Sequence, residues 1–594
     1  MATYYVRADG TVTAANRATA TGLGDADTFL SMAQLNLCSG ANALLAGDIV
    51  YFSSVGGDYP TNLTVPAGGS GVGAEISYLN KPGETPKIAT ATASLINTNS
   101  KSNIAVGGFD ILYSGTDAAG SGISIGGSVS NVAINNISLN MGGYGYLITS
   151  AGSVSGVNIN NFTGVGGGTT RESIYFFGAA NSSITLNGIE IIGGRYISIQ
   201  NSVGVALRDI THTGCYGTAG DIYVNNCSGL LTIDNCSSIS STGIGINIKS
   251  TAVVVFSDGS SISNCNVSAT AGGYAGYSFS NVANITISDC VNLNSGGKGF
   301  NVIDGSHDLI FTRCESDGAA DSHFNAANNA YNITYNKCEA HNGLGDGFVT
   351  SNAAHDVTYN YCVAHHSGTK TSTAEGDGFT SHLTCYNIIL NYCIAHDMIC
   401  SGFAMVGNSS GNINNCISYN NAGDWSVEGG GKLDQIRGGF YLPLEGVNPT
   451  SGVSWTIRNN IGNNNYPREI YLTATSKSLV DMDYNCYLER VAGQLASLDS
   501  GSTNIDWDTY HETYEEHSQH VDPQWIDTTY FKLQSTSPCR NAGVDVGLTT
   551  DYHGNPVPER SRIVIDSDIH LAQRKTKANP AIGIAEYVPD ISIS

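Results

Sequence analysis

Four segments in the middle of the chain decide the fold: Phe311-Thr-Arg-Cys314, Thr334-Tyr-Asn-Lys-Cys338, Thr358-Tyr-Asn-Tyr-Cys362 and Leu390-Asn-Tyr-Cys393. Their cysteines are 24, 24 and 31 positions apart. The column extends to further cysteines, which are Cys236, Cys265, Cys290 and Cys416. A repeat of this length is typical of solenoids, in which each unit packs only against its neighbours.

Apolar residues continue this cysteine column upstream and form a second column beside it. The upstream members are Ile137, Phe162, Ile189 and Ile210, with Ile461 expected as a later one. The second column follows the cysteines by ten residues or so and consists of Phe300, Phe324, Phe348, Phe379, Phe403 and Phe440. Each unit therefore has two inward-facing strands that it buries only by stacking on its neighbours. The pattern predicts an all-β, parallel β-helix of about 24 residues per coil.

The cysteine column predicts buried thiols. Stacked coils lie about 4.8 Å apart, and this separation exceeds the 3.5–4.5 Å that disulfide Cβ atoms prefer. We therefore expect Cys236 to Cys416 to behave as small hydrophobic residues. No Cys-x-x-Cys pair occurs, so the pattern does not predict a zinc site.

Composition excludes several classes of protein. The 594 residues carry a formal net charge of −24, which argues against nucleic acid as a partner. Charged residues make up 13% and apolar residues 41%, which excludes a disordered chain. The N-terminus lacks the features of a signal peptide, and no apolar run reaches the roughly 18 residues of a membrane span. We expect a mature N-terminus or a virion component.

Three regions are expected along the chain. Residues 1–75 are interpreted as an N-terminal cap with a short helix around Asp27–Asn36. Residues 76–486 form the β-helix. Residues 487–594, with Trp507 and Trp525, form a β-rich C-terminal cap or small domain.

Both ends of the sequence resemble one family. Tyr4-Tyr5-Val6-Arg7-Ala8-Asp9-Gly10 and Gly47-Asp48-Ile49-Val50-Tyr51-Phe52 are similar to the usual entry of the right-handed parallel β-helix, pectin-lyase-like superfamily. Asp522-Pro523-Gln524-Trp525 and Asn541-Ala542-Gly543-Val544-Asp545 resemble its closing segment. The resemblance implies a single-stranded, right-handed coil. The superfamily includes phage tailspikes and polysaccharide depolymerases. The resemblance does not imply one reaction, because the superfamily hosts many.

Two insertions interrupt the regular coils. One adds about seven residues within 366–375, and the other about thirteen between Cys416 and Phe440. Both lie between the same two columns, so we expect them to leave the helix at the same corner and form walls of one groove.

Two aspartates occupy equivalent positions beside that corner. Asp346 and Asp377 each precede Gly-Phe on adjacent coils, so their carboxylates should lie about 5 Å apart. That separation suits the acid and nucleophile of a retaining glycosidase, or a Ca²⁺ site. An aspartate before glycine is also ordinary turn chemistry, and this alternative stays open.

Histidines supply candidates for proton transfer. His341, His365 and His396 each follow a column cysteine by three positions, so they form a ladder of their own. His366 and His382 depart from this ladder and are the candidate bases.

Further candidates complete the expected site. Arg437 is a candidate to neutralise a substrate carboxylate. The candidate substrate-binding residues in the insertions are Lys370, Glu375, Trp425 and Glu428.

The sequence thus predicts a protein that cleaves an extracellular polysaccharide, as a lyase or a glycoside hydrolase, in a groove over residues 340–440. Its cofactor is expected to be none or Ca²⁺. The alternative is a non-catalytic glycan-binding adhesin or phage tail receptor-binding protein. A homotrimer is expected only if the chain is a tailspike.

Overall fold

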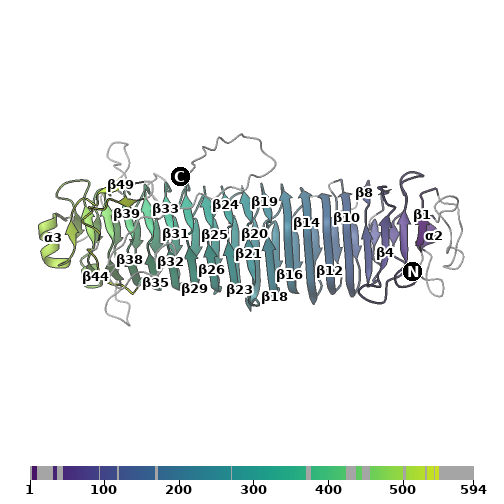
Figure 1. Ribbon diagram of the computed structural model, residues 1–594, viewed down its shortest axis with the longest axis horizontal. Helices are drawn as coiled ribbons and strands as arrows, with labels where there is room; N and C mark the ends of the chain where they lie inside the picture. The colour runs from purple at the N-terminus through teal and green to yellow at the C-terminus, as the bar shows by residue number, and fades with distance from the viewer. Residues whose placement is uncertain are drawn as a thin grey trace.

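The computed structural model describes most of the solenoid. The described residues are 3–9, 31–36, 44–92, 94–116, 120–142, 144–150, 152–166, 171–268, 270–368, 376–422, 437–444, 455–498, 503–528, 531–540 and 542–547. They form roughly 16 turns of about 25 residues, stacked along one long axis (Figure 1). The fold is the all-β parallel β-helix that the repeat predicts.

Each coil in the C-terminal half has three strands. The first face comprises β25 (Phe300–Ile303), β28 (Phe324–Ala326), β31 (Phe348–Thr350), β34 (Phe379–Ser381), β37 (Phe403–Met405), β40 (Phe440–Leu442) and β43 (Ile470–Leu472). The second face comprises β26 (His307–Thr312), β29 (Tyr331–Asn336), β32 (His355–Asn360), β35 (Tyr386–Asn391), β38 (Gly411–Asn414), β41 (Trp455–Arg458) and β44 (Val480–Asp483). The third face comprises β27 (Glu315–Asp317), β30 (Glu339–His341), β33 (Val363–His365), β36 (Ile394–His396), β39 (Ile417–Tyr419), β42 (Ile461–Asn463) and β45 (Cys486–Leu488).

Longer strands build the preceding coils. β10 (Val129–Asn140), β12 (Val154–Val165), β14 (Asn181–Ile192) and β16 (Ser202–Thr213) each have 12 residues and pair in parallel with the next. The first-face strands of these coils are shorter, such as β15 (Ile197–Gln200) and β17 (Ile222–Asn225). Register is thus kept from coil to coil, which aligns like residues inside the helix.

Both expected columns are confirmed. Phe324, Phe348 and Phe379 are partners in the parallel ladder, and their rings stack at 4.7 and 4.8 Å. The column cysteines from Cys236 to Cys416 are buried free thiols. Ile137, Phe162, Ile189 and Ile210 share one register upstream of them. The core is therefore a set of stacked aromatic, aliphatic and sulfur ladders.

One later member of the cysteine column differs from the expectation. Ile461 pairs with Ile417 on the third face, one position beyond the column. The backbone N–H of Cys416 instead donates to Asn460 Oδ1 at 2.8 Å, and that of Asn460 to Asn485 Oδ1 at 2.9 Å. The column therefore ends in asparagines that bond the neighbouring coil.

The parallel ladder extends into both terminal regions. β1 (Thr3–Val6) pairs with β2 (Ile49–Phe52), so residues 1–75 contribute strands to the solenoid as well as the short helix α2 (Met32–Asn36). At the other end, α3 (Trp507–Tyr514) precedes β48 (Gln519–His520), which pairs with β45. The antiparallel pair β49 (Trp525–Asp527) and β50 (Lys532–Leu533) follows.

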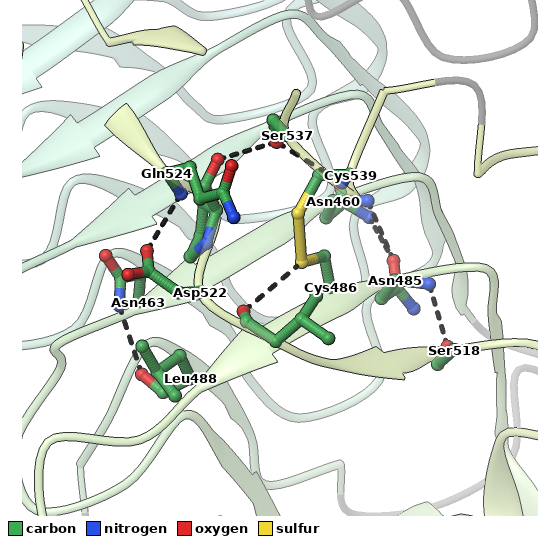
Figure 2. The surroundings of a disulfide bond; sticks show 12 residues. Asn460, Asn463, Asn485, Cys486, Leu488, Ser518, Asp522, Gln524, Ser537 and Cys539 are labelled. Atoms are coloured by element: carbon green, nitrogen blue, oxygen red, sulfur yellow. Dashed lines mark hydrogen bonds between the residues drawn. A yellow bond between two sulfur atoms is a disulfide. The ribbon is translucent and has the colours of Figure 1, made fainter. Parts of the chain in front are cut away.

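A disulfide joins the closing segment to the third face (Figure 2). Cys486 in β45 is bonded to Cys539. Phe531 and Leu533 pack against Ile417 and Ile461 in the same hydrophobic cluster. This pair lies outside the predicted thiol column of Cys236 to Cys416, and Cys539 approaches from outside the coil stack, so the spacing that keeps stacked cysteines apart does not apply to it. Cys38 lies outside the described residues.

Candidate functional site

A groove of about 580 Å³ runs across several coils of the first face. Its floor includes Asn301, Asn325 and Val349, the outward residues of β25, β28 and β31. Polar and charged residues of the turns before and after these strands form its lips, and they include Lys298, Asp321, Asp346, Asn352 and His382. Parallel strands of equal register place these turns in two rows, so the groove follows the long axis of the molecule.

Asp346 lies in one lip at the turn before β31. Its Oδ1 accepts hydrogen bonds from the backbone N–H groups of Gly376 and Asp377, at 2.8 and 2.9 Å. Burial and then the nearby Asp377 carboxylate raise the pKa of Asp346 to about 7, against the opposing effect of those N–H groups. The protonated form of this carboxyl group is therefore favoured far more than in an ordinary aspartate.

Asp377 precedes β34 in the next coil and is buried. Arg437 Nη1 donates to Oδ1 and to Oδ2, both at 2.9 Å, and the backbone N–H of Ser401 donates to Oδ1 at 2.7 Å. The Asp377 carboxylate raises the pKa of Arg437 above its ordinary value. The guanidinium thus supplies the positive charge that the buried Asp377 carboxylate needs.

His382 follows β34 and lines the groove from the other lip. Burial lowers the pKa of its imidazole, while the Asp377 carboxylate raises it and Arg437 lowers it further. His382 is therefore a neutral imidazole at neutral pH, able to donate and accept hydrogen bonds.

Asp321 and Lys298 belong to the groove, and the sequence did not single them out as site residues. Lys298 Nζ and the Asp321 carboxylate form an ion pair between neighbouring coils. Burial opposes ionisation of Asp321, but hydrogen bonds from Lys298 and Ser322 lower its pKa overall. Asp321 stands one position off the register of Asp346 and Asp377, so a search for equivalent positions misses it.

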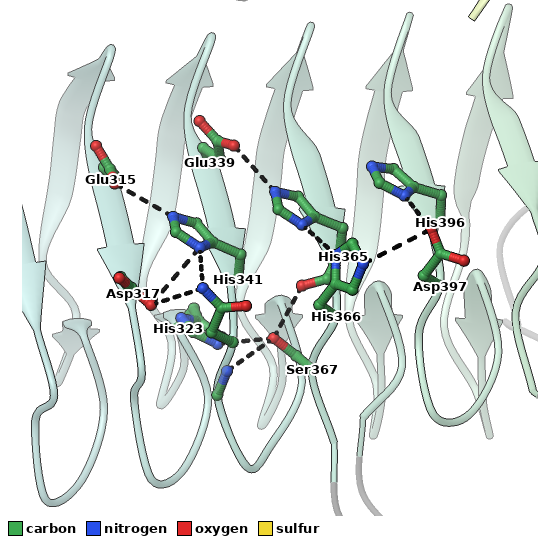
Figure 3. Close-up of polar contacts among 12 residues, drawn as sticks. Glu315, Asp317, His323, Glu339, His341, His365, His366, Ser367, His396 and Asp397 are labelled. Carbon is green, nitrogen blue, oxygen red and sulfur yellow. Dashed lines mark hydrogen bonds and ion pairs between the residues drawn. The ribbon is translucent and has the colours of Figure 1, made fainter. Parts of the chain in front are cut away.

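His366 lies on the third face, beside the histidine ladder (Figure 3). The rings of His341, His365 and His396 stack at 5.0 and 4.9 Å. His366 Nδ1 lies 2.7 Å from His365 Nδ1, and His366 Nε2 lies 4.0 Å from Asp397 Oδ2. The contacts of His366 are therefore with the ladder, whereas Asp346 and His382 line the groove and the Asp377–Arg437 pair lies behind them.

The remaining candidates are Lys370, Glu375, Trp425 and Glu428, and they lie outside the described residues. Their insertions begin and end at the corner that carries the two aspartates: Gly368 and Gly376 flank the first, and Arg437 follows the second. An ideal Cβ on Gly376 would lie 2.4 Å from Gly368 Cα, so the two ends of the first insertion are adjacent.

The parallel strand ladder and the sequence repeat define the fold class of the protein. The chain is a right-handed parallel β-helix, and residues 220–374 match the family model described as "Right handed beta helix region". No curated protein matches the sequence. Among the described residues, no helix has the length and apolarity needed to cross a bilayer.

Solved structures with some likeness are β-helix proteins of several activities. A double mutant of the periplasmic alginate epimerase AlgG is 12% identical, with 67% of this chain and 77% of that one covered and a TM-score of 0.34. The tailspike protein of E. coli bacteriophage HK620, in complex with a pentasaccharide, is 10% identical with 72% of each chain covered and a TM-score of 0.29. Pectate lyase Pel9A is 13% identical, covering 92% and 93%, with a TM-score of 0.21. At these scores we draw no activity from the comparisons.

Proposed function

We propose that the protein is a polysaccharide-cleaving β-helix, extracellular or virion-borne, that hydrolyses a neutral glycan in the groove of the first face. The observation that carries the proposal is the opposite shift of two carboxyl groups in one groove: the pKa of Asp346 is raised to about 7, and that of Asp321 is lowered. Neighbouring acids with separated pKa values are the arrangement that general acid–base hydrolysis of a glycoside requires.

In this proposal Asp346 acts as the acid and Asp321 as the base. Asp346 donates its proton to the glycosidic oxygen as the bond to the anomeric carbon breaks. Asp321 takes a proton from the water molecule whose oxygen bonds that carbon. Asp377 is less suitable for this role because its side chain is only 9% exposed, against 47% for that of Asp321. Direct attack of water predicts inversion at the anomeric carbon.

The charges of the groove favour a neutral substrate. Lys298 is the one Lys or Arg among the described residues that line it, and it is paired with Asp321. Arg437 is likewise paired with Asp377. A uronic acid polymer would need a cation for its carboxylate, whereas the amides of Asn301, Asn325 and Asn352 suit sugar hydroxyl groups.

The test is cleavage of a panel of neutral and uronic acid polysaccharides by the full chain, followed by mass and NMR analysis of the products. We expect saturated products with one added water and inverted anomeric configuration. Asp346→Asn and Asp321→Asn should each lower the rate at least 100-fold, in the range ascribed to general acid–base catalysis. The matched control is Asp289→Asn, since Asp289 pairs with Arg313 of the neighbouring coil but does not line the groove.

Unsaturated products would show that the protein cleaves by β-elimination, as a lyase, and not by hydrolysis. Binding without cleavage across the panel would support the alternative, a glycan-binding adhesin or tail receptor-binding protein.

A further inference from the structure

A second cluster of chemically active side chains lies inside an earlier coil, away from the groove. His212 is near the end of β16, Cys215 is in the turn that follows, and Asp221 immediately precedes β17. The three side chains belong to fully buried residues, each 0% exposed. One ring nitrogen, the Cys215 sulfur and a carboxylate oxygen lie within 4.8 Å of one another.

The hydrogen bond of His212 determines which of its nitrogens is available. His212 Nε2 lies 3.0 Å from the carbonyl oxygen of Gly193, which only accepts hydrogen bonds, so Nε2 carries the proton. Nδ1 of the neutral ring therefore presents a lone pair. It is buried and has no hydrogen-bond partner among the described residues. A backbone carbonyl that orients the distal N–H is the usual second partner of a metal-bound histidine.

Asp221 is held in place by the next coil. Ser238 donates a hydrogen bond to its Oδ2, and Ser241 donates to its Oδ1 at 2.7 Å. Cys215 and Asp221 are both fully buried, so two acidic side chains lie beside each other away from solvent. Two buried acids with an unpaired imidazole nitrogen are costly as they stand.

We propose that His212, Cys215 and Asp221 bind one divalent transition-metal ion, with Zn²⁺ as the best match. Nitrogen, thiolate and carboxylate donors are all zinc ligands, and the +2 charge balances the two deprotonated acids. A hydrogen-bonded network without metal would account for Asp221 and its serines, but it leaves His212 Nδ1 with no donor. The sequence signature is His-x₂-Cys-x₅-Asp, which a search for paired cysteines does not detect.

The ion would have a structural role. The site is closed to solvent, so metal must enter while the chain folds. It joins the end of one third-face strand to the start of the next first-face strand. In the next coil the partner of β16 is divided into two strands, β18 (Ser228–Asp234) and β19 (Ser237–Ile239), and His212 pairs with Ser238 of β19.

The test uses the full chain expressed with zinc, passed through chelator and analysed by elemental mass spectrometry. We expect one zinc per chain that resists chelator until the protein is denatured. Protein expressed with Co²⁺ should show a sulfur-to-cobalt charge-transfer band. Cys215→Ser should lose the band and the tightly held metal, whereas Cys227→Ser, which alters a buried thiol outside the cluster, should keep both.

A second control addresses the exposed cluster of His366, His396 and Asp397, which could hold metal at the surface. His366→Ala should leave the buried metal in place. Wild-type protein without bound metal or charge-transfer band would overturn the proposal, and so would metal that disappears in His366→Ala but persists in Cys215→Ser. If Cys215→Ser fails to fold, two other measurements test the site. The wild-type chain should show the cobalt band, and Asp221→Asn should lose the tightly held metal.

Discussion

Arg437 binds both carboxylate oxygens of Asp377 through a single nitrogen, Nη1, at 2.9 Å each, across 60 positions of sequence. The contact ties the end of the second insertion to the start of the coil that follows the first. It also sets the charge next to Asp346, whose pKa depends on Asp377 and Arg437. The ion pair therefore links the stability of this corner to the chemistry of the groove.

Removing only the arginine should be costly. Arg437→Met leaves Asp377 buried without its cation, so we expect the free energy of unfolding to fall by about 3–5 kcal/mol. The double variant Asp377→Asn/Arg437→Met should recover most of this loss, because no uncompensated charge remains. Denaturant titration measures both. Arg313→Met, at a more exposed pair with Asp289, should cost about 0–1 kcal/mol; equal losses for both arginines would contradict the prediction.

The activity of the groove should depend on the protonation of Asp346. The acid must carry a proton, so kcat/KM should fall as pH rises through about 7. The base Asp321 stays ionised down to acidic pH because its pKa is lowered, and activity should persist into that range. A pH–rate profile measures both limbs. An alkaline limb unmoved by the charge-altering variant Asp377→Asn would argue against Asp346 as the titrating group.

The protonation of Asp346 should also make the free energy of unfolding depend on pH. The pKa of Asp346 is raised in the folded state, so its contribution is fully present below the ordinary value of 3.8 and is lost as pH rises through about 7. Compared with wild type, Asp346→Asn should therefore gain relative stability between these values. Thermal unfolding of both proteins at several pH values checks this; parallel curves would show that Asp346 titrates normally.

His382 should contribute to binding rather than to proton transfer. Its imidazole is neutral at neutral pH and faces the groove from the lip opposite Asp346. We expect His382→Ala to raise KM several-fold with little change in kcat, and His382→Gln to restore part of the affinity through its amide. Steady-state kinetics separates the two parameters. A collapse of kcat would instead assign His382 as the base of a lyase.

The cysteines should divide into two chemical groups. In denatured, unreduced protein, alkylation should label the twelve buried free cysteines of the described chain and spare Cys486 and Cys539. Peptide mass mapping identifies each site. Cys539→Ser should destabilise the closing segment by up to about 4 kcal/mol, the chain-entropy value for a loop of 53 residues. Labelling of Cys486 before reduction would show that the bond is absent.

The amino-acid sequence by itself determined the architecture, because a solenoid is encoded locally. Each coil repeats the same inward positions at nearly constant spacing, so Phe324, Phe348 and Phe379 could be aligned before their stacked rings were seen. The same regularity placed Asp346 and Asp377 on neighbouring coils and located the corner where the insertions leave the helix.

Only the tertiary structure decided which side chains meet across that regular frame. Asp321 joined the groove from one position off register, His366 lay on the third face, and Cys539 reached Cys486 from outside the stack. His212, Cys215 and Asp221 converged inside a corner that no repeat marks. The physical reason is that spacing along the chain fixes the coil and face of a residue, whereas charge pairing and burial depend on side-chain directions and on segments that return from far away in sequence.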